Sequence, residues 1–354
     1  MQDRFQRNVT RLRVSVTDLC NLSCVYCSPS QGIPHLERKD ILSFEEIATV
    51  VKYGAELGIR SVRLTGGEPI TRRNVERLVA SLSKIPGIED LAMTTNGVLL
   101  RQYASILKEA GLMRLNVSLD SLRADRFRQI TGGGSISDVL QGIEEALHVG
   151  FLETKVNMVV MRGTNEDEVE EFARISLEKP LEVRFIEYMA FGCRMIEERK
   201  FVPSKEVMER ISRLGELIPV GRDRPLGLSN KDRSKVENPP SLRQAQDKPF
   251  GRDLSLLLPL RGPARLYRLK GAVGTMGFIS PVSQPFCGDC NRLRLTSDGR
   301  LRACLLAGGE VDIRAILRGN PTPETIKRAF LEAAVLKPAE HSGTGEAVMC
   351  RIGG

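Results

Sequence analysis

The chain has 354 residues, with 52 Lys and Arg against 44 Asp and Glu, and 41% of its residues are hydrophobic. This length accommodates about two domains of roughly 150 residues, and the composition excludes a wholly disordered or fibrous protein. No run approaches the roughly 18 apolar residues that cross a bilayer, and the first residues lack a secretory apolar stretch, so we expect a cytoplasmic protein without a membrane partner.

The net charge of +8 is compatible with nucleic acid, an anionic surface or a small polyanion. Trp is absent, and the chain has only 5 Tyr and 12 Phe, so the aromatic platforms on which single-stranded nucleic acids stack are scarce. We therefore expect a small polyanionic ligand and no nucleic acid.

Six apolar runs with strand character alternate with helix-like stretches between residues 11 and 215, and their sequences are LRVSVT, SVRLTGG, LAMTTNG, RLNVSLD, KVNMVVM and VRFIEY. Regular alternation of this kind predicts a parallel sheet covered by helices, as in a full or partial barrel. In such folds the functional residues lie at the carboxyl ends of the strands and in the loops that follow.

The alternation stops after residue 215, and residues 222–262 are rich in Pro, Arg, Lys and Asp. We interpret this stretch as a flexible insertion, with a basic docking arm as the alternative. Strand-like sequence resumes at residue 263, and an amphipathic helix is predicted near 322–335. The sequence thus predicts a unit at 1–215, a linker at 216–262 and a carboxyl-terminal unit at 263–354.

Three cysteines follow the first predicted strand with the spacing C-x3-C-x2-C, at Cys20, Cys24 and Cys27. In a long chain in a reducing compartment, such clustering favours a metal or catalytic role over disulfides. Three thiolates can hold a four-iron cluster and leave one iron open to a further ligand, whereas structural zinc requires four ligands. This spacing predicts an iron–sulfur cluster with one open iron.

A second triplet near the other end of the chain consists of Cys287, Cys290 and Cys304. It again supplies three local thiolates, so a second cluster with an open iron is predicted. The alternative is a zinc ribbon that takes its fourth ligand from Cys193, His341 or Cys350.

Polar motifs follow the second, third and fourth predicted strands. Gly66-Gly67-Glu68-Pro69 presents backbone N–H groups that could receive the carboxylate or amine of a small zwitterion. Thr94 to Gly97 and Ser118 to Asp120 stand at the ends of the next two strands, where each alone is typical of a turn or helix cap. Because all three motifs follow neighbouring parallel strands, they are expected at the same edge of the sheet, and this shared position indicates a site.

Several basic residues lie within otherwise apolar strands: Arg13, Arg63, Lys155 and Arg184. Arg292 and Arg294 follow Cys290 at alternate positions, which on an extended chain places both on one face. A buried guanidinium without an anionic partner costs several kcal/mol, so a multiply charged phosphate ligand would satisfy several of these residues together.

The first cysteine triplet, with Tyr26 before its last cysteine, resembles the motif of the radical S-adenosylmethionine superfamily. The resemblance implies that S-adenosylmethionine chelates the open iron and is cleaved to a 5′-deoxyadenosyl radical. The GGE sequence at 66–68 resembles the motif that contacts the amino group of this cofactor in the superfamily.

Over nearly its whole length the chain resembles the GTP 3′,8-cyclase family, the MoaA proteins of molybdenum cofactor biosynthesis, from LRVSVTDLCNLSCVYC to GFISPVSQPFCGDCNRLRLTSDG and the final Gly353-Gly354. The resemblance implies a partial (βα)6 TIM-type barrel, closed by a carboxyl-terminal region that carries the second [4Fe-4S] cluster. It assigns S-adenosylmethionine to Tyr26, Gly67, Ser118 and Met189, GTP to Arg13, Arg63, Thr94, Lys155, Arg292 and Arg294, and a catalytic role to Gly353 and Gly354.

The resemblance also implies the reaction. The adenosyl radical takes hydrogen from ribose C3′, and the ribose carbon adds to C8 of a guanine held at the second cluster, forming 3′,8-cyclo-7,8-dihydro-GTP. The implied partners are a flavodoxin- or ferredoxin-type reductant, a downstream cyclic pyranopterin monophosphate synthase and a second copy in a homodimer.

Two departures from the family pattern are visible. The family often has a basic residue two positions before Arg63, where this chain has Ser61, and the neighbouring Arg60 would point to the other face of the strand. Residues 222–262 have no counterpart. The alternatives are a radical enzyme acting on a peptide or another metabolite, and a zinc-stabilised basic binding module without catalysis.

Overall fold

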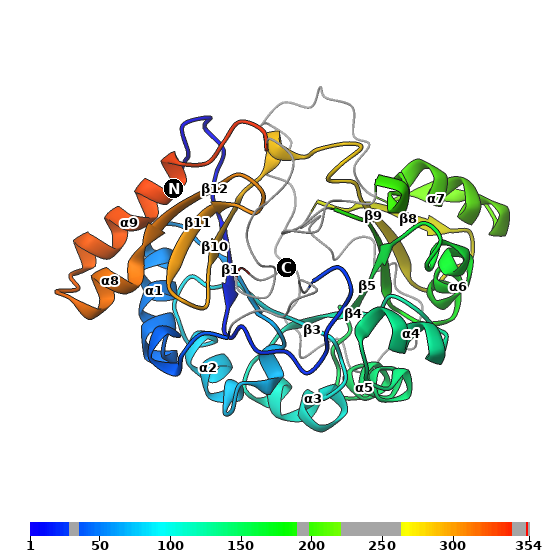
Figure 1. Cartoon of the computed structure of the whole chain (residues 1–354), viewed down its shortest axis with the longest axis horizontal. Coiled ribbons are helices and arrows are strands. Elements are labelled where there is room, and N and C mark those ends of the chain that lie inside the picture. The colour runs from blue at the N-terminus through cyan, green and yellow to red at the C-terminus, as the bar shows by residue number, and fades with distance from the viewer. Residues whose placement is uncertain (28–34, 190–197, 221–262, 342–351, 353–354) are drawn as a thin grey trace, which may run out of the picture.

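A computed structural model describes residues 1–27, 35–189, 198–220, 263–341 and 352. One curved sheet of twelve strands forms its centre, and helices cover the outer side of the curve (Figure 1). The strands follow the order β12-β11-β10-β1-β2-β3-β4-β5-β6-β9-β8-β7, and no pairing joins the two edge strands within the described residues. The sheet is therefore an open, partial barrel.

The six strands predicted from the sequence form the middle of the sheet and all run parallel. They are β1 (Arg11–Ser15), β2 (Ser61–Thr65), β3 (Asp90–Thr95), β4 (Arg114–Ser118), β5 (Lys155–Val160) and β6 (Glu182–Glu187). The helices between and after them are α1 (Phe44–Glu56), α2 (Val75–Leu82), α3 (Leu100–Glu109), α4 (Ala124–Thr131), α5 (Ile136–His148), α6 (Val169–Glu178) and α7 (Ser204–Ile211). The predicted (βα)6 barrel is confirmed.

The carboxyl-terminal part extends this sheet at both edges. Its elements are β8 (Arg265–Leu269), β9 (Thr275–Ile279), β10 (Arg292–Leu295), β11 (Arg300–Cys304), β12 (Gly308–Asp312), α8 (Ile313–Arg318) and α9 (Pro323–Val335). Strand β9 continues the parallel sheet beyond β6, and β10 continues it beyond β1. The region around the second cysteine triplet thus shares one sheet with the region around the first.

A short strand, β7 (Leu217–Pro219), pairs antiparallel with β8. It lies within the first residues of the stretch that the sequence predicts as a linker, while 222–262 lies outside the described residues. Single-turn 3-10 helices complete the described structure: η1 (Arg38–Asp40), η2 (Pro69–Thr71), η3 (Glu166–Glu168), η4 (Glu198–Lys200), η5 (Ser212–Leu214) and η9 (Cys287–Asp289). No helix in the described ranges is long and apolar enough to span a membrane.

Alternation along the strands separates an apolar outer layer from a polar interior. In β1, Leu12 and Val14 belong to the apolar core packed under the helices, whereas Arg11 and Arg13 alternate with them and line a pocket inside the barrel. A strand turns successive side chains to opposite faces, so this pattern follows from the sequence. The barrel interior is consequently built to bind something polar.

Helix α9 packs closely against α1 at Gly54 and Phe330. A Cβ added at Gly54 would lie 2.9 Å from the Phe330 ring, and Phe330 is completely buried. Both helices begin with a capping box, Ser43 with Glu46 and Thr322 with Thr325. The absence of a side chain at Gly54 therefore creates the space in which the aromatic ring packs.

We expect Phe330→Ala to lower the free energy of unfolding by about 3–5 kcal/mol, because it removes a buried ring and leaves a cavity. Leu331→Ala is the matched control, since Leu331 is 46% exposed and should change stability by less than about 0.5 kcal/mol. Denaturant titration of both variants measures the difference, and equal stability of the two would contradict this packing.

Candidate active site between two cysteine triplets

The first cysteine triplet lies in the loop that follows β1, at the carboxyl edge of the parallel strands. Burial raises the pKa of the Cys24 thiol well above its usual value, and the nearby charges of Cys27, Asp120 and Cys20 raise it further. The backbone N–H of Leu22 donates to Cys20 Sγ at 3.4 Å. Three thiols gathered this closely suit a cationic iron centre that would offset their mutual repulsion.

Tyr26 is held by Asp120, which the third polar motif supplies. The Tyr26 hydroxyl donates to Asp120 Oδ2 at 2.6 Å, and the backbone N–H of Val159 donates to the other carboxylate oxygen at 2.8 Å. Burial raises the pKa of Asp120 to about 6. The cysteine loop is thereby fixed to the ends of β4 and β5.

The two glycines of the GGE motif have a packing role. A Cβ at Gly66 would lie 2.5 Å from Thr17 O, and one at Gly67 would lie 2.2 Å from Leu19 O. The N–H of Gly67 donates to Thr17 O and that of Glu68 to Leu19 O, both at 2.8 Å. Two of the N–H groups that the motif could offer to a ligand, those of Gly67 and Glu68, are therefore already bonded to the segment that precedes Cys20.

Glu68 joins the first two polar motifs. Its carboxylate accepts hydrogen bonds from Ile70 N at 3.1 Å, Thr95 Oγ1 at 2.8 Å and Asn96 N at 2.6 Å. Burial raises the pKa of Glu68 to about 7. Asn96 in turn reaches the cysteine loop through Nδ2, which donates to Asn21 Oδ1 at 2.8 Å. The motifs predicted to share an edge do share it.

The other residues assigned to the cofactor and substrate lie at or near the same edge. Ser118 ends β4 and stands beside Asn157, Thr94 stands beside Asn116, and Met189 follows β6 by two residues. All three predicted residues are half-buried. Gly353 and Gly354 lie outside the described residues.

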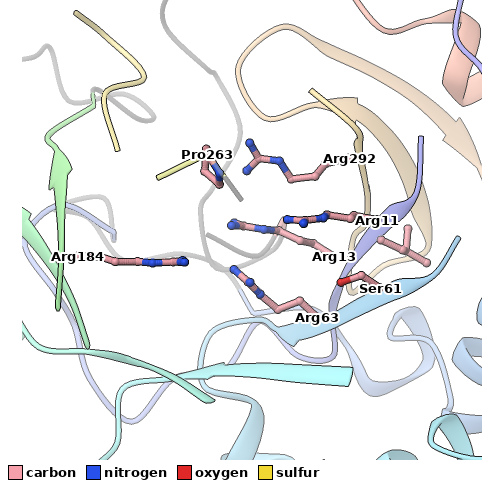
Figure 2. Close-up of a pocket in the computed structure, with 8 residues that line it drawn as sticks. Arg11, Arg13, Ser61, Arg63, Arg184, Pro263 and Arg292 are labelled. Atoms are coloured by element: carbon pink, nitrogen blue, oxygen red, sulfur yellow. The ribbon is translucent and has the colours of Figure 1, made fainter. Parts of the chain in front are cut away.

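Five arginines from four strands converge on one pocket inside the barrel (Figure 2). The pocket is lined by Arg11, Leu12, Arg13, Ser61, Arg63, Arg184, Pro263 and Arg292. Strand register explains the convergence, since Arg13 stands beside Arg63 in β2 and beside Arg294 in β10. The parallel pairing thus aligns basic residues that are far apart in the sequence.

Arg13 and Arg63 are half-buried, Arg184 and Arg294 are buried, and the charges in this pocket repel one another. Burial lowers the pKa of Arg63 and of Arg294 to about 9, and burial with the charges of Arg294 and Arg63 lowers that of Arg13 well below its usual value. A guanidinium keeps its proton at neutral pH, so the charge is held there at an electrostatic cost. Within the described residues no carboxylate lies at ion-pair distance from Arg13, Arg63 or Arg292. A polyanionic ligand would offset this cost.

Lys155 and Arg184 share one internal carboxylate. The Lys155 ammonium and the Arg184 guanidinium both contact Glu182, and all three residues are buried. Burial, with the charge of Arg184, lowers the pKa of Lys155 to about 8. Although burial alone would raise it, Arg184 and Lys155 lower the pKa of Glu182 to about 2. Two cations and one carboxylate leave this side of the interior positive.

Arg11 and Arg184 line the pocket but are not among the residues that the family resemblance assigns to GTP. Arg184 was noted in its strand, and Arg11 was missed although it precedes Arg13 by two positions and must share its face. Arg11 stands directly beside Ser61, and Ser61 Oγ donates to Asp90 Oδ2 at 2.6 Å. Arg60 turns away, as expected, and donates to Ala55 O at 2.9 Å. The guanidinium group of Arg11 thus lies next to Ser61, the position at which the family often has a basic residue.

The second cysteine triplet is assembled from η9 and the end of β11. Burial raises the pKa of the Cys287 thiol, and the charges of Cys290 and Cys304 add to the effect. At Cys290 burial acts in the same direction, but Arg292 and Lys337 bring the pKa of the thiol down to about 7. The three thiols therefore lie near one another, in a more positive environment than the first triplet.

His341 is one of three residues that the zinc alternative offers as a fourth ligand of the second triplet. Its Nε2 lies 3.2 Å from Pro281 O, while Cys193 and Cys350 lie outside the described residues. In the part of the chain that the structure describes, no three His, Cys, Asp or Glu side chains are close enough for a single metal ion.

The two triplets lie at opposite ends of β1. Cys20 follows its carboxyl end, whereas Cys290 precedes β10, whose first residue, Arg292, stands beside Arg11 at the amino end of β1. A parallel strand of five residues spans about 16 Å. The arginine pocket is built on the same strands, so a phosphate-rich ligand there would lie between two iron–sulfur sites.

Comparison with known proteins places the chain among characterised relatives. The profile of the radical SAM superfamily matches residues 14–175, and the profile described as Molybdenum Cofactor Synthesis C matches residues 252–343. Proteins named GTP 3′,8-cyclase are similar to the chain: that of Alkaliphilus metalliredigens is 44% identical, covering 96% of this chain and 94% of the relative, and that of Pelotomaculum thermopropionicum is 45% identical, covering 96% and 95%. The relative from Heliobacterium modesticaldum is 41% identical over the whole of both chains.

Among solved structures, Streptococcus suis SuiB bound to S-adenosylmethionine matches with a TM-score of 0.53 and 12% identity, covering 91% of this chain and 68% of that one. A second structure of Streptococcus suis SuiB matches with a TM-score of 0.52 and 13% identity, covering 89% of this chain and 63% of that one. At this identity the likeness establishes the fold alone.

We expect Arg63→Met to raise the melting temperature of the ligand-free protein by about 2–4 °C, or roughly 1 kcal/mol, because it removes one of several like charges crowded into the pocket. The same variant should lose most of the stabilisation that inorganic triphosphate gives the parent. Arg60→Met is the control, since Arg60 lies on the other face and should leave the triphosphate effect intact. Thermal melts with and without triphosphate decide between them, and an undiminished effect in Arg63→Met would contradict an anion site.

Proposed function

The chain belongs to the GTP 3′,8-cyclase family, and on that premise we propose that it converts GTP to (8S)-3′,8-cyclo-7,8-dihydroguanosine 5′-triphosphate, the first step of molybdenum cofactor biosynthesis. The observation that carries the proposal is the arginine pocket between two three-cysteine sites. The phosphates of a nucleoside triphosphate need several cations, and the proposed reaction needs an iron–sulfur site on each side of the nucleotide.

The first triplet fits a [4Fe-4S] cluster with S-adenosylmethionine. Cys20, Cys24 and Cys27 would hold it, and its neighbours at the strand ends, Gly67 and Ser118, with Tyr26 and Met189, would contact the cofactor. When bound, these groups supply one-electron chemistry and a hydrogen acceptor. The protein contributes a fixed loop, which the hydrogen bond of Tyr26 to Asp120 and the glycine contacts of 66–67 hold against the barrel.

The arginine pocket would hold the triphosphate. The family resemblance assigns four arginines to GTP, namely Arg13, Arg63, Arg292 and Arg294. Arg11 and Arg184 also line this pocket. Guanidinium groups bind phosphate oxygens in pairs and orient them, so several arginines from different strands fix the position of the nucleotide as well as its charge. With the triphosphate fixed, Thr94 and Lys155 would complete the contacts to the rest of GTP.

The second triplet would hold the other [4Fe-4S] cluster and receive the guanine base. Cys287, Cys290 and Cys304 stand at the amino end of β1 and β10, which is the end of the interior away from the first triplet. The base at one end and the cofactor at the other would place the ribose between them, where hydrogen is removed from C3′. The protein then acts through placement and exclusion of water.

Gly353 and Gly354 are proposed to enter the active site rather than to fray. Ile352, which precedes them, is only 3% exposed. The residue before the two glycines is therefore packed against other atoms of the protein, which supports the proposal.

Three partners and a location complete the proposal. Cys20 is exposed and Leu19 beside it is 48% exposed, so a flavodoxin- or ferredoxin-type reductant could dock near the first triplet. A cyclic pyranopterin monophosphate synthase would consume the product. Exposed apolar residues at the end of α9, namely Val335 and Leu336, suit a homodimer contact. Thiol-held clusters favour the reducing cytoplasm.

We expect the anaerobically reconstituted protein to hold about eight irons, four for each cluster. Incubation with GTP, S-adenosylmethionine and dithionite should then yield 5′-deoxyadenosine and the cyclised nucleotide, identified by mass spectrometry. Cys24→Ser should abolish both products, whereas Cys290→Ser should retain some 5′-deoxyadenosine and lose the nucleotide product. Saturation at four irons, or cleavage of the cofactor with a peptide but never with GTP, would overturn the proposal.

Removal of Gly353 and Gly354 should lower the yield of cyclised nucleotide at least tenfold and leave the melting temperature within about 1 °C, because two terminal glycines contribute little to packing. Product yield and thermal melting of the same preparation measure the two effects. A shortened chain with full yield would show that the tail takes no part in the reaction.

A further inference from the structure

A buried lysine lies beside the second cysteine triplet, and the proposed function does not use it. Lys337 follows helix α9 and is 2% exposed. Its ammonium donates to Cys290 Sγ at 3.5 Å, to Arg292 O at 2.9 Å and to Ala303 O at 3.3 Å. An ammonium has three N–H donors, so these three acceptors satisfy it completely.

The acceptors satisfy the hydrogen bonds of Lys337 but leave its charge without a counterion. No carboxylate in the described ranges lies at ion-pair distance from its Nζ, although lysine is almost never fully buried unless it is paired. A buried charge without an opposite charge costs several kcal/mol. The anionic group at hand is the thiolate of Cys290 and, with it, the set of three thiolates.

The segment after Lys337 reaches the triplet a second time. A backbone hydrogen bond joins His341 to Cys287. Arg7 donates to Cys287 O at 2.6 Å and to Pro338 O at 2.7 Å, and Asp3 holds the Arg7 guanidinium at 2.6 Å. The segment 337–341 is therefore clamped against the cysteine loop, which keeps the Lys337 ammonium at the sulfur.

We propose that Lys337 is a positioning and tuning residue of the second iron–sulfur cluster, which stabilises the cluster's anionic, reduced form through its charge and its hydrogen bond to Cys290 Sγ. This inference rests on the proposed function, because it presumes a cluster at Cys287, Cys290 and Cys304. Hydrogen bonds to sulfur and a nearby positive charge raise the reduction potential of such clusters, because both stabilise the more negative, reduced form. A lysine that only tied β10 to β11 would leave the potential unchanged.

The test is the midpoint potential of the second cluster in the full chain, with Cys20, Cys24 and Cys27 replaced by serine so that one cluster reports. Lys337→Met keeps the length of the side chain and removes both charge and donors, and Lys337→Gln keeps donors alone. Lys327→Met is the matched control, since Lys327 lies on α9, its side chain is 35% exposed, and its ammonium contacts the Glu56 carboxylate at 2.7 Å, away from the cysteines. Potentiometric titration followed by electron paramagnetic resonance gives the potentials.

We expect Lys337→Met to weaken reduction at least tenfold, which is about 59 mV more negative for a one-electron couple. Lys337→Gln should shift less in the same direction, and Lys327→Met should not shift. If Lys337→Met loses its cluster, the potential of Lys337→Gln decides. A more negative value supports the inference, and an equal or more positive value overturns it. Potentials equal to the parent overturn the inference, whatever the melting temperatures.

Iron content separates this inference from the proposed function. The serine background should hold about four irons. A background without iron shows that no second cluster forms, which refutes the proposed function and the role of Lys337 together. A background with four irons and an unshifted potential refutes the role of Lys337 alone.

Discussion

The constraint to which the rest of this structure answers is the crowding of several like-charged guanidinium groups in the interior of an open barrel. Arg13 and Arg63 stand side by side on neighbouring parallel strands, and Arg294 continues the row on the other side of Arg13. An apolar barrel interior would stabilise the fold better, because buried like charges repel and lose their hydration. The arrangement is reasonable only if a multiply charged anion completes it, and the family to which the chain belongs has such a substrate.

The same sheet explains why two cysteine sites at opposite ends of the sequence serve one pocket. Strand β10 pairs with β1 in parallel register, which brings the segment after Cys290 beside the segment before Cys20. The first triplet follows the carboxyl end of β1, and the second precedes the amino end of β10. Each site is therefore anchored to a strand of the pocket, and neither needs a separate domain to be positioned.

Each cysteine loop is held by polar contacts rather than by a core of its own. The first loop depends on Gly66 and Gly67, which admit its backbone at distances no side chain would permit, and on Asp120, which binds Tyr26. The second depends on the ammonium of Lys337 and on Arg7, which joins the loop to the segment after α9. Ligand loops without apolar cores are expected to order fully only when their metal centres are bound.

The amino-acid sequence by itself determined the six parallel strands, both cysteine triplets and the inward face of Arg13 and Arg63, because strand alternation and ligand spacing are local properties. It could not show that β9 and β10 join the same sheet, since strand pairing between distant segments depends on register in three dimensions. For that reason Arg11, Arg7 and Lys337 were missed, as were the hydrogen bonds that the N–H groups of Gly67 and Glu68 donate to the segment before Cys20. Only the tertiary structure decided these points, because burial and long-range hydrogen bonding are set by which segments meet.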